Sequence, residues 1–173
     1  MEDSSNISVK SVSIKYGVIL GLISIIYFVI LDFIGKSTQQ EWNYVGLIFS
    51  AIVFYFAYKE FKEQGDGYMS YGQGLGIGTL TSLVSSVISG VFSFIYIKFI
   101  NTAYIENIKQ MQIAKLEEQG LSDAQIEQAQ PMMDMFTSPV AILIMAIFMG
   151  TLLGFILSLI LSAIFKQSRP ELI

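Results

Sequence analysis

The chain has 173 residues, of which 53% are hydrophobic and only 14% are charged, and its formal net charge is −4. A soluble domain of this length usually keeps about a quarter of its residues charged, so the composition is typical of a chain solvated by lipid. The acidic balance gives no support for nucleic acid as a partner. Cys and His are both absent, which excludes disulfides and thiolate chemistry and removes the commonest metal ligand.

Long uncharged stretches predict four transmembrane helices. A hydrocarbon core of about 30 Å needs about 20 apolar residues in a helix, and four stretches meet or approach that length. Trp42 and Tyr44 at the start of the second stretch, and Tyr55 and Tyr58 at its end, fit the aromatic belts found at membrane surfaces. We place the spans at about residues 16–34, 42–58, 72–97 and 139–165.

The distribution of Lys and Arg predicts the orientation of these spans. Most cations fall in the amino-terminal segment, the loop after the second span and the carboxy-terminal segment, which share one side of the membrane. The positive-inside rule then places both termini in the cytoplasm. The cations on the cytoplasmic side are Lys10, Lys15, Lys59, Lys62, Lys166 and Arg169.

The segment from about 100 to 137 would lie on the opposite, extracytoplasmic side, and its pattern predicts two amphipathic helices. Apolar residues recur at helical spacing from Ile100 onward. Gly120 suits a helix stop, and Ser122 with Gln125 fits a capping box that opens a second helix, which we expect to be interrupted near Pro131. The predicted fold is therefore all-α, an integral membrane bundle of four transmembrane helices in a single domain (1–173), with an extracytoplasmic helical hairpin between helices 3 and 4.

Small residues four apart form stripes along three of the spans, and residues at this spacing share one helix face. Such stripes let two backbones approach closely in a membrane. We interpret them as packing surfaces within the bundle, with a dimer interface or a substrate groove as alternatives. The packing residues are Gly17 and Gly21 in the first span, Gly74, Gly78, Ser82, Ser86 and Gly90 in the third, and Ala146, Gly150, Gly154, Ser158 and Ser162 in the fourth.

Within the spans, groups that could carry chemistry are few. Asp32 is the one ionisable residue in a span, and it lies near the helix end where water reaches it. Ser and Thr are plentiful in the third span, but no base is placed beside them, and hydroxyls in helices often bond the carbonyl one turn back. We therefore expect no catalytic residue, no metal ligand and no cofactor, and we predict that the protein is not an enzyme.

Gly67-Tyr68-Met69-Ser70-Tyr71-Gly72-Gln73-Gly74 leads into the third span and, together with the order of the spans, resembles a known family. This is the bacterial membrane family of domain of unknown function 4199 (DUF4199), and the resemblance covers about Ile14 to Lys166. It implies a multi-pass protein of the bacterial cytoplasmic (inner) membrane. The family has no established activity, so the resemblance assigns no functional residue.

Three functions remain open on the sequence. The first is a non-enzymatic accessory or scaffold subunit whose outer hairpin contacts another membrane protein, or packs only on itself or the membrane. The second is a homo-oligomeric carrier for a lipid or another hydrophobic substrate, with the small-residue stripes as its groove. The third, which we disfavour, is an enzyme on lipid substrates that uses Glu106, Glu117 and Asp134. Possible docking residues for the first function are Ile100, Tyr104, Ile108, Met111, Ile126 and Met132.

Overall fold

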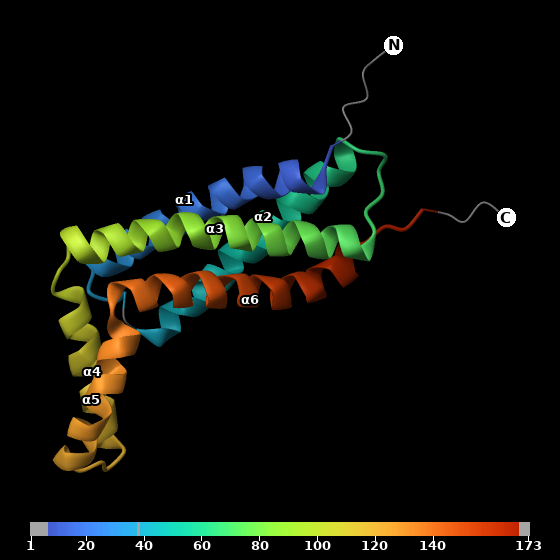
Figure 1. Cartoon of the computed structure of the whole chain (residues 1–173). Coiled ribbons are helices and arrows are strands. Elements are labelled where there is room, and N and C mark those ends of the chain that lie inside the picture. Colours follow the sequence, from blue (N-terminus) through green and yellow to red (C-terminus); the bar gives the residue numbers. More distant parts are fainter. Residues whose placement is uncertain (1–6, 38, 170–173) are drawn as a thin grey trace. The chain divides into compact units, whose positions relative to one another are not determined.

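The structure is a computed structural model that describes residues 7–37 and 39–169. Within these residues the regular secondary structure is helical, apart from one isolated β-bridge. Four long helices and two shorter ones follow one another along the chain (Figure 1). They are α1 (Val9–Phe33), α2 (Asn43–Glu63), α3 (Tyr71–Phe99), α4 (Tyr104–Glu118), α5 (Asp123–Thr137) and α6 (Pro139–Phe165), with a short 3-10 turn, η1 (Gln40–Trp42), before α2.

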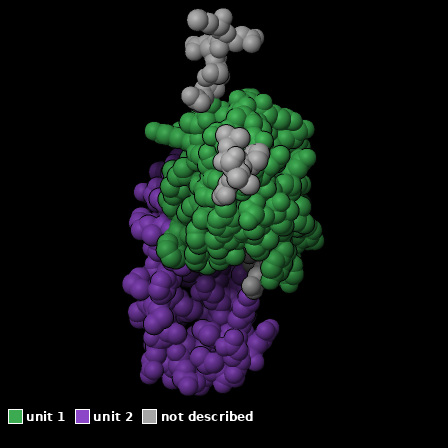
Figure 2. Space-filling view, turned by 90° about the vertical axis from the view of Figure 1, so that its right-hand side faces the viewer, with its two compact units in different colours: residues 1–89, 147–173 green, residues 90–146 purple. Residues whose placement is uncertain are grey.

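The chain divides into two compact units, coloured separately in Figure 2. Unit 1 comprises residues 1–89 and 147–173, and unit 2 comprises residues 90–146. The boundary falls inside two helices, because α3 and α6 each pass from one unit into the other. Unit 1 therefore holds α1, α2 and the larger parts of α3 and α6, and unit 2 holds α4 and α5.

Helices α1, α2, α3 and α6 are long and apolar enough to cross a membrane. This confirms the all-helical prediction with four candidate spans. α6 begins and ends where the sequence predicted, whereas α1 starts earlier, at Val9. The reason is a cap, since the Ser8 side chain accepts a hydrogen bond from the backbone N–H of Ser11 at 3.0 Å.

The burial pattern of α6 is the reverse of that in a soluble helix. Its buried residues are Gly154, Ser158 and Ser162. Large apolar side chains, such as Phe148 and Ile160, point outward and are more than half exposed. Soluble proteins rarely expose apolar patches of this extent to water, so this outer surface fits a hydrocarbon environment. The four candidate spans and this surface together indicate a membrane protein.

The small residues of α3 and α6 lie directly against one another in an antiparallel register. Ser162 lies against Gly74 and Ser158 against Gly78, and further along Ser82 lies against Gly154 and Ser86 against Gly150. Each step of four residues along α3 is matched by a step of four back along α6. A Cβ added at Gly74 would lie 2.9 Å from the Ser162 hydroxyl oxygen, and one added at Gly154 would overlap Ser82. The two backbones are thus as close as glycine allows.

Helix α1 packs on α3 in the parallel direction. Gly17 lies against Val84 and Gly21 against Ile88, so four residues forward on one helix match four forward on the other. The hydroxyl of Ser13 adds a bond of 3.3 Å to the carbonyl oxygen of Ile77. Helix α2 completes the interior of unit 1 with large side chains, and the core residues are Val12, Leu20, Val53, Phe54, Ala57, Tyr58, Phe61, Met69 and Ile77.

In unit 2, α4 and α5 are joined by a tight turn and pair with each other. Gly120, with φ of +83°, follows the end of α4 as predicted, because this conformation suits glycine. The predicted capping box is also confirmed, since the Gln125 side chain accepts a bond of 2.9 Å from the backbone N–H of Ser122. Across the pair, the Lys109 ammonium lies 2.5 Å from the Asp134 carboxylate.

The expected interruption of the second helix near Pro131 is wrong, because α5 continues through this residue to Thr137. Proline removes one backbone hydrogen bond from the helix interior. Pro131 and Glu127, whose carbonyl group loses its partner, are both exposed residues. Capping at Ser122 and burial of Ile126 stabilise the helix on the amino-terminal side of the proline.

Glycine contacts in the spans generate a stability prediction. Gly154→Ala places a Cβ into Ser82, and we expect a loss of about 1–3 kcal/mol, the usual range for overpacking. Gly46→Ala is the matched control, because a Cβ there meets nothing within 4 Å and alanine favours the helix. Thermal unfolding of both variants in detergent measures the difference. Equal melting temperatures for the two variants would contradict the close α3–α6 contact.

Candidate functional site

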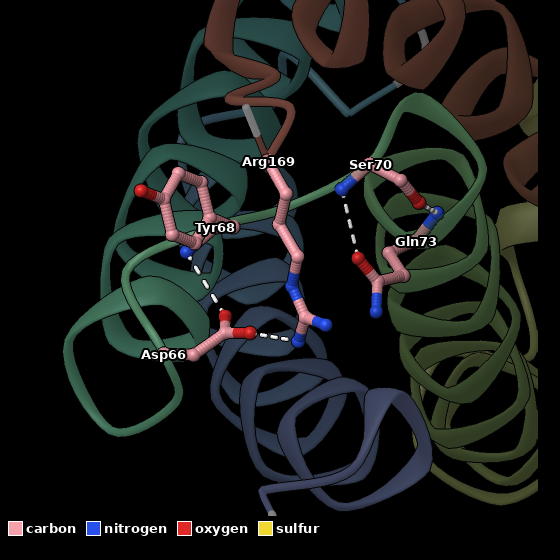
Figure 3. A network of polar contacts seen from close by, with 5 residues as sticks. All are labelled: Asp66, Tyr68, Ser70, Gln73 and Arg169. Atoms are coloured by element: carbon pink, nitrogen blue, oxygen red, sulfur yellow. Dashed lines mark hydrogen bonds and ion pairs between the residues drawn. The ribbon is translucent and has the colours of Figure 1, made fainter. Parts of the chain in front are cut away.

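A polar network closes one end of unit 1, where α2 ends, α3 begins and the chain leaves α6 (Figure 3). The loop between α2 and α3 turns at Gly67, whose φ is +83°. Just before it, the Asp66 carboxylate accepts a bond of 3.1 Å from the backbone N–H of Tyr68. The same carboxylate forms an ion pair with the Arg169 guanidinium. Asp66 therefore ties its own loop to the segment after α6.

Met69 fixes this loop to the body of unit 1. Its side chain is fully buried and belongs to the core. Its backbone forms a two-way bridge with Gln167, with N–H to oxygen distances of 3.0 and 2.9 Å. A buried side chain and a paired backbone together hold the loop more firmly than the exposed ion pair, since exposed ion pairs contribute little.

Ser70 and Gln73 cap the start of α3. The Gln73 side-chain oxygen accepts from the backbone N–H of Ser70 at 2.7 Å, and the Ser70 hydroxyl accepts from the backbone N–H of Gln73 at 3.2 Å. This reciprocal arrangement is a capping box, which satisfies backbone N–H groups that an exposed helix start leaves without partners. Along the Gly67–Gly74 stretch, Gly67 makes the turn and Met69 anchors the loop in the core. Ser70 and Gln73 then cap α3, and Gly74 makes the first contact with α6.

A cavity of about 710 Å³ lies within this end of unit 1. Among the described lining residues, the Arg169 guanidinium is already paired with the Asp66 carboxylate. The described lining therefore offers mainly neutral donors and acceptors from Ser, Gln and Tyr side chains. The lining residues are Ile7, Phe61, Gln64, Gly65, Asp66, Tyr68, Ser70, Gln73, Gln167, Ser168 and Arg169.

Inside the spans, hydroxyl groups pair across helices. The Tyr58 and Ser162 hydroxyls lie 3.1 Å apart, and those of Thr79 and Ser158 lie 3.4 Å apart. The Thr79 and Ser158 hydroxyls also lie within bonding distance of carbonyl groups of their own helices, at 2.8 and 2.9 Å. Because each hydroxyl has a single proton, one that donates to its own helix can only accept a bond from the other hydroxyl. These bonds satisfy buried polar groups within unit 1. In the described part of the chain, no cluster of three or more acidic residues could hold a metal ion.

The predicted packing residues and docking residues meet different surroundings. Gly17, Gly21 and the α3 and α6 stripes within unit 1 lie at helix contacts, while Gly90 and Ala146 carry the same four-residue spacing into unit 2. Among the docking candidates, Ile126 is buried, whereas Ile100 and Met132 are exposed. Tyr104, Ile108 and Met111 are half-buried. Only two of the six docking candidates are therefore fully open on the surface.

Sequence reasoning missed the residues of the polar network. Asp66 and Arg169 are separated by 103 positions, and no local pattern connects them. The same holds for Lys15 and Glu60, whose side chains meet at 2.5 Å on the same side of unit 1. Ser70 and Gln73 did carry a readable signal, since Ser-x-x-Gln before an apolar run is a capping-box pattern.

The network predicts a pH dependence. The backbone N–H of Tyr68, and then the Arg169 guanidinium, lower the pKa of Asp66 below its ordinary value of 3.8. A lowered folded-state pKa stabilises the fold above the ordinary value, and the contribution is lost as pH falls through the lowered pKa. Hydrogen exchange of the Met69 and Gln167 amides, corrected for intrinsic rates, should be constant from pH 7 to 5 and should accelerate below about 4. Asp66→Asn should remove this dependence, and an unchanged profile in that variant would contradict the assignment.

Comparisons with known proteins identify the family. No curated protein and no solved structure matches the chain. One family model matches residues 15–167, which is nearly the whole chain and includes the complete loop motif Gly67–Gly74. This confirms the resemblance seen in the sequence. The chain therefore belongs to the family described as protein of unknown function (DUF4199).

Proposed function

We propose that this membrane protein is a non-enzymatic accessory or scaffold subunit of a bacterial inner-membrane complex, with both termini in the cytoplasm. The observation that carries the proposal is an exposed apolar row on α5, formed by Met132, Met135 and Phe136. These residues lie outside the four candidate spans, at the spacing of one helix face. Methionine side chains adapt to irregular partner surfaces.

The charge of α5 favours a protein partner over the membrane surface. Helices that lie on membranes usually carry Lys and Arg on their polar face, which attract anionic lipids. Helix α5 has neither, and it carries Asp123, Glu127 and Asp134. An apolar partner surface flanked by basic residues would complement this helix. The partner would be another membrane protein, because the row precedes α6 by only a few residues.

The carrier hypothesis receives less support from the geometry. Its groove would use the small-residue stripes, yet the stripes of α3 and α6 are packed against each other in unit 1. Opening that contact would expose Ser82, Ser158 and Ser162, which are buried. A carrier would therefore need another pathway.

The orientation follows from charge at the polar end of unit 1. This end contains Lys15, Lys59, Lys62 and Arg169 beside Glu60 and Asp66. The segments that flank the spans on this side carry six of the ten Lys and Arg residues of the chain, and this bias supports a cytoplasmic position for this end. The α4–α5 pair then lies outside the cytoplasm.

A pull-down from native membranes tests the proposal. The full chain carries a tag at its carboxy terminus, and partners recovered in mild detergent are quantified by mass spectrometry. Met132→Glu and Met135→Glu should each remove a stoichiometric partner, because they place a charge in the apolar row. We avoid Ile108→Glu, since Ile108 is half-buried and its replacement would disturb unit 2 itself.

The matched control is Gln130→Glu, which adds the same charge on the opposite face of α5. It should retain the partner. Recovery of the same proteins with all three variants would reject docking through the α5 row. Recovery of this chain alone would reject the accessory role and leave a homo-oligomer.

A further inference from the structure

A second cavity lies between the last turns of α2 and α6, and the proposed function makes no use of it. It has a volume of about 310 Å³ and lies wholly within unit 1. Both helices are candidate spans, so the cavity lies where a membrane's hydrocarbon core gives way to its head groups. Its lining residues are Tyr55, Tyr58, Lys59, Lys62, Glu63 and Phe165.

Two ammonium groups line this cavity with donors to spare. Lys59 and Lys62 are three residues apart on α2 and share a helix face. The Lys59 ammonium lies 3.7 Å from the Glu63 carboxylate, which is longer than a charge-assisted hydrogen bond of about 2.7–2.9 Å. The Lys62 ammonium donates one bond of 3.4 Å to the carbonyl oxygen of Phe165. Each ammonium has three donors, so both can bind a further anionic oxygen.

The other wall of the cavity is aromatic. The Phe165 ring packs edge-on against Tyr55, with ring centroids 5.5 Å apart, and lies 6.3 Å from the Tyr58 ring centroid. Aromatic rings at this level of a membrane contact both the apolar chains and the polar head groups. The cavity thus combines cations with an apolar wall, a combination that suits a lipid better than a free anion.

We propose that this cavity binds the phosphate group of a membrane glycerophospholipid. Lys59 and Lys62 donate hydrogen bonds to the phosphate oxygens, and the rings of Tyr55 and Phe165 contact the glycerol and the first acyl carbons. The Glu63 carboxylate accepts a hydrogen bond from a head-group hydroxyl. Among the described lining residues, two cations against one carboxylate give a net positive charge, which favours an anionic lipid such as phosphatidylglycerol.

Binding to the delipidated full-length protein in detergent tests this assignment by native mass spectrometry. The probes are phosphatidylglycerol, diacylglycerol with the same acyl chains, and glycerol 3-phosphate. Phosphatidylglycerol should bind, and Lys59→Gln combined with Lys62→Gln should weaken it by roughly ten- to thirtyfold, given the contribution of each Lys near a lipid surface. Lys59→Arg combined with Lys62→Arg keeps the charge and should retain binding.

The charge-matched control is Lys10→Gln combined with Lys115→Gln, which removes two cations outside the cavity. It should bind phosphatidylglycerol like the unmodified protein, and thermal unfolding should show that both Gln double variants are folded. If the control variant bound phosphatidylglycerol as weakly as the Lys59→Gln, Lys62→Gln variant, net charge alone would explain the loss of affinity, and the site would be overturned. Equal binding of diacylglycerol would overturn the role of the phosphate. Binding of glycerol 3-phosphate as tight as that of the lipid would overturn the lipid assignment in favour of a free phosphate ester.

Discussion

The close contact between α3 and α6 determines the arrangement of unit 1. Lipid tails are as apolar as leucine, so helices in a membrane gain little from burying large apolar side chains against each other. Close backbone approach and hydrogen bonds across the contact take over that role, and both require small residues. Gly74, Gly78, Gly150 and Gly154 supply the space, and serines of the opposite helix fill it. The large residues of α6 are left facing outward.

The register of this contact also builds the polar network. Ser162 lies against Gly74. Gln167 stands five residues after Ser162, just past the end of α6, and Met69 stands five residues before Gly74. Their backbone bridge continues the same antiparallel pairing beyond the ends of the helices. Arg169 then reaches Asp66 for the same reason. The Gly67–Gly74 stretch is therefore the segment in which the α3–α6 contact is capped and closed.

Much of the fold could be predicted from residue patterns. Span positions follow from stretches without charge, and the limits of α6 agree because a proline opens it and polar residues follow it. The turn at Gly120 and the cap at Ser122 were readable because both are local signals. The helix break predicted at Pro131 was wrong because a well-capped helix tolerates a proline on its exposed side. The sequence alone did not show that this side is exposed.

The candidate sites were harder to predict, because they depend on contacts between distant segments. In the sequence, Lys59 and Lys62 indicate only the orientation of the spans. The structure places Phe165 beside them in one cavity. The apolar stripe from Tyr104 to Met111 has the right period for docking, yet Tyr104, Ile108 and Met111 are all half-buried. The exposed row on α5 emerges only once burial is known. Periodicity identifies an apolar face, but it does not say whether that face is already covered.

Disulfide formation in native membranes tests the α3–α6 contact most directly. The chain contains no cysteine, so Thr79→Cys combined with Ser158→Cys introduces one defined pair where hydroxyl oxygens now lie 3.4 Å apart. Mild oxidation should link the two positions within one chain, while Thr79→Cys combined with Ile160→Cys, whose second position faces outward, should stay unlinked. A link that joins two copies of the chain, or no link at all, would contradict an intramolecular contact between the two stripes.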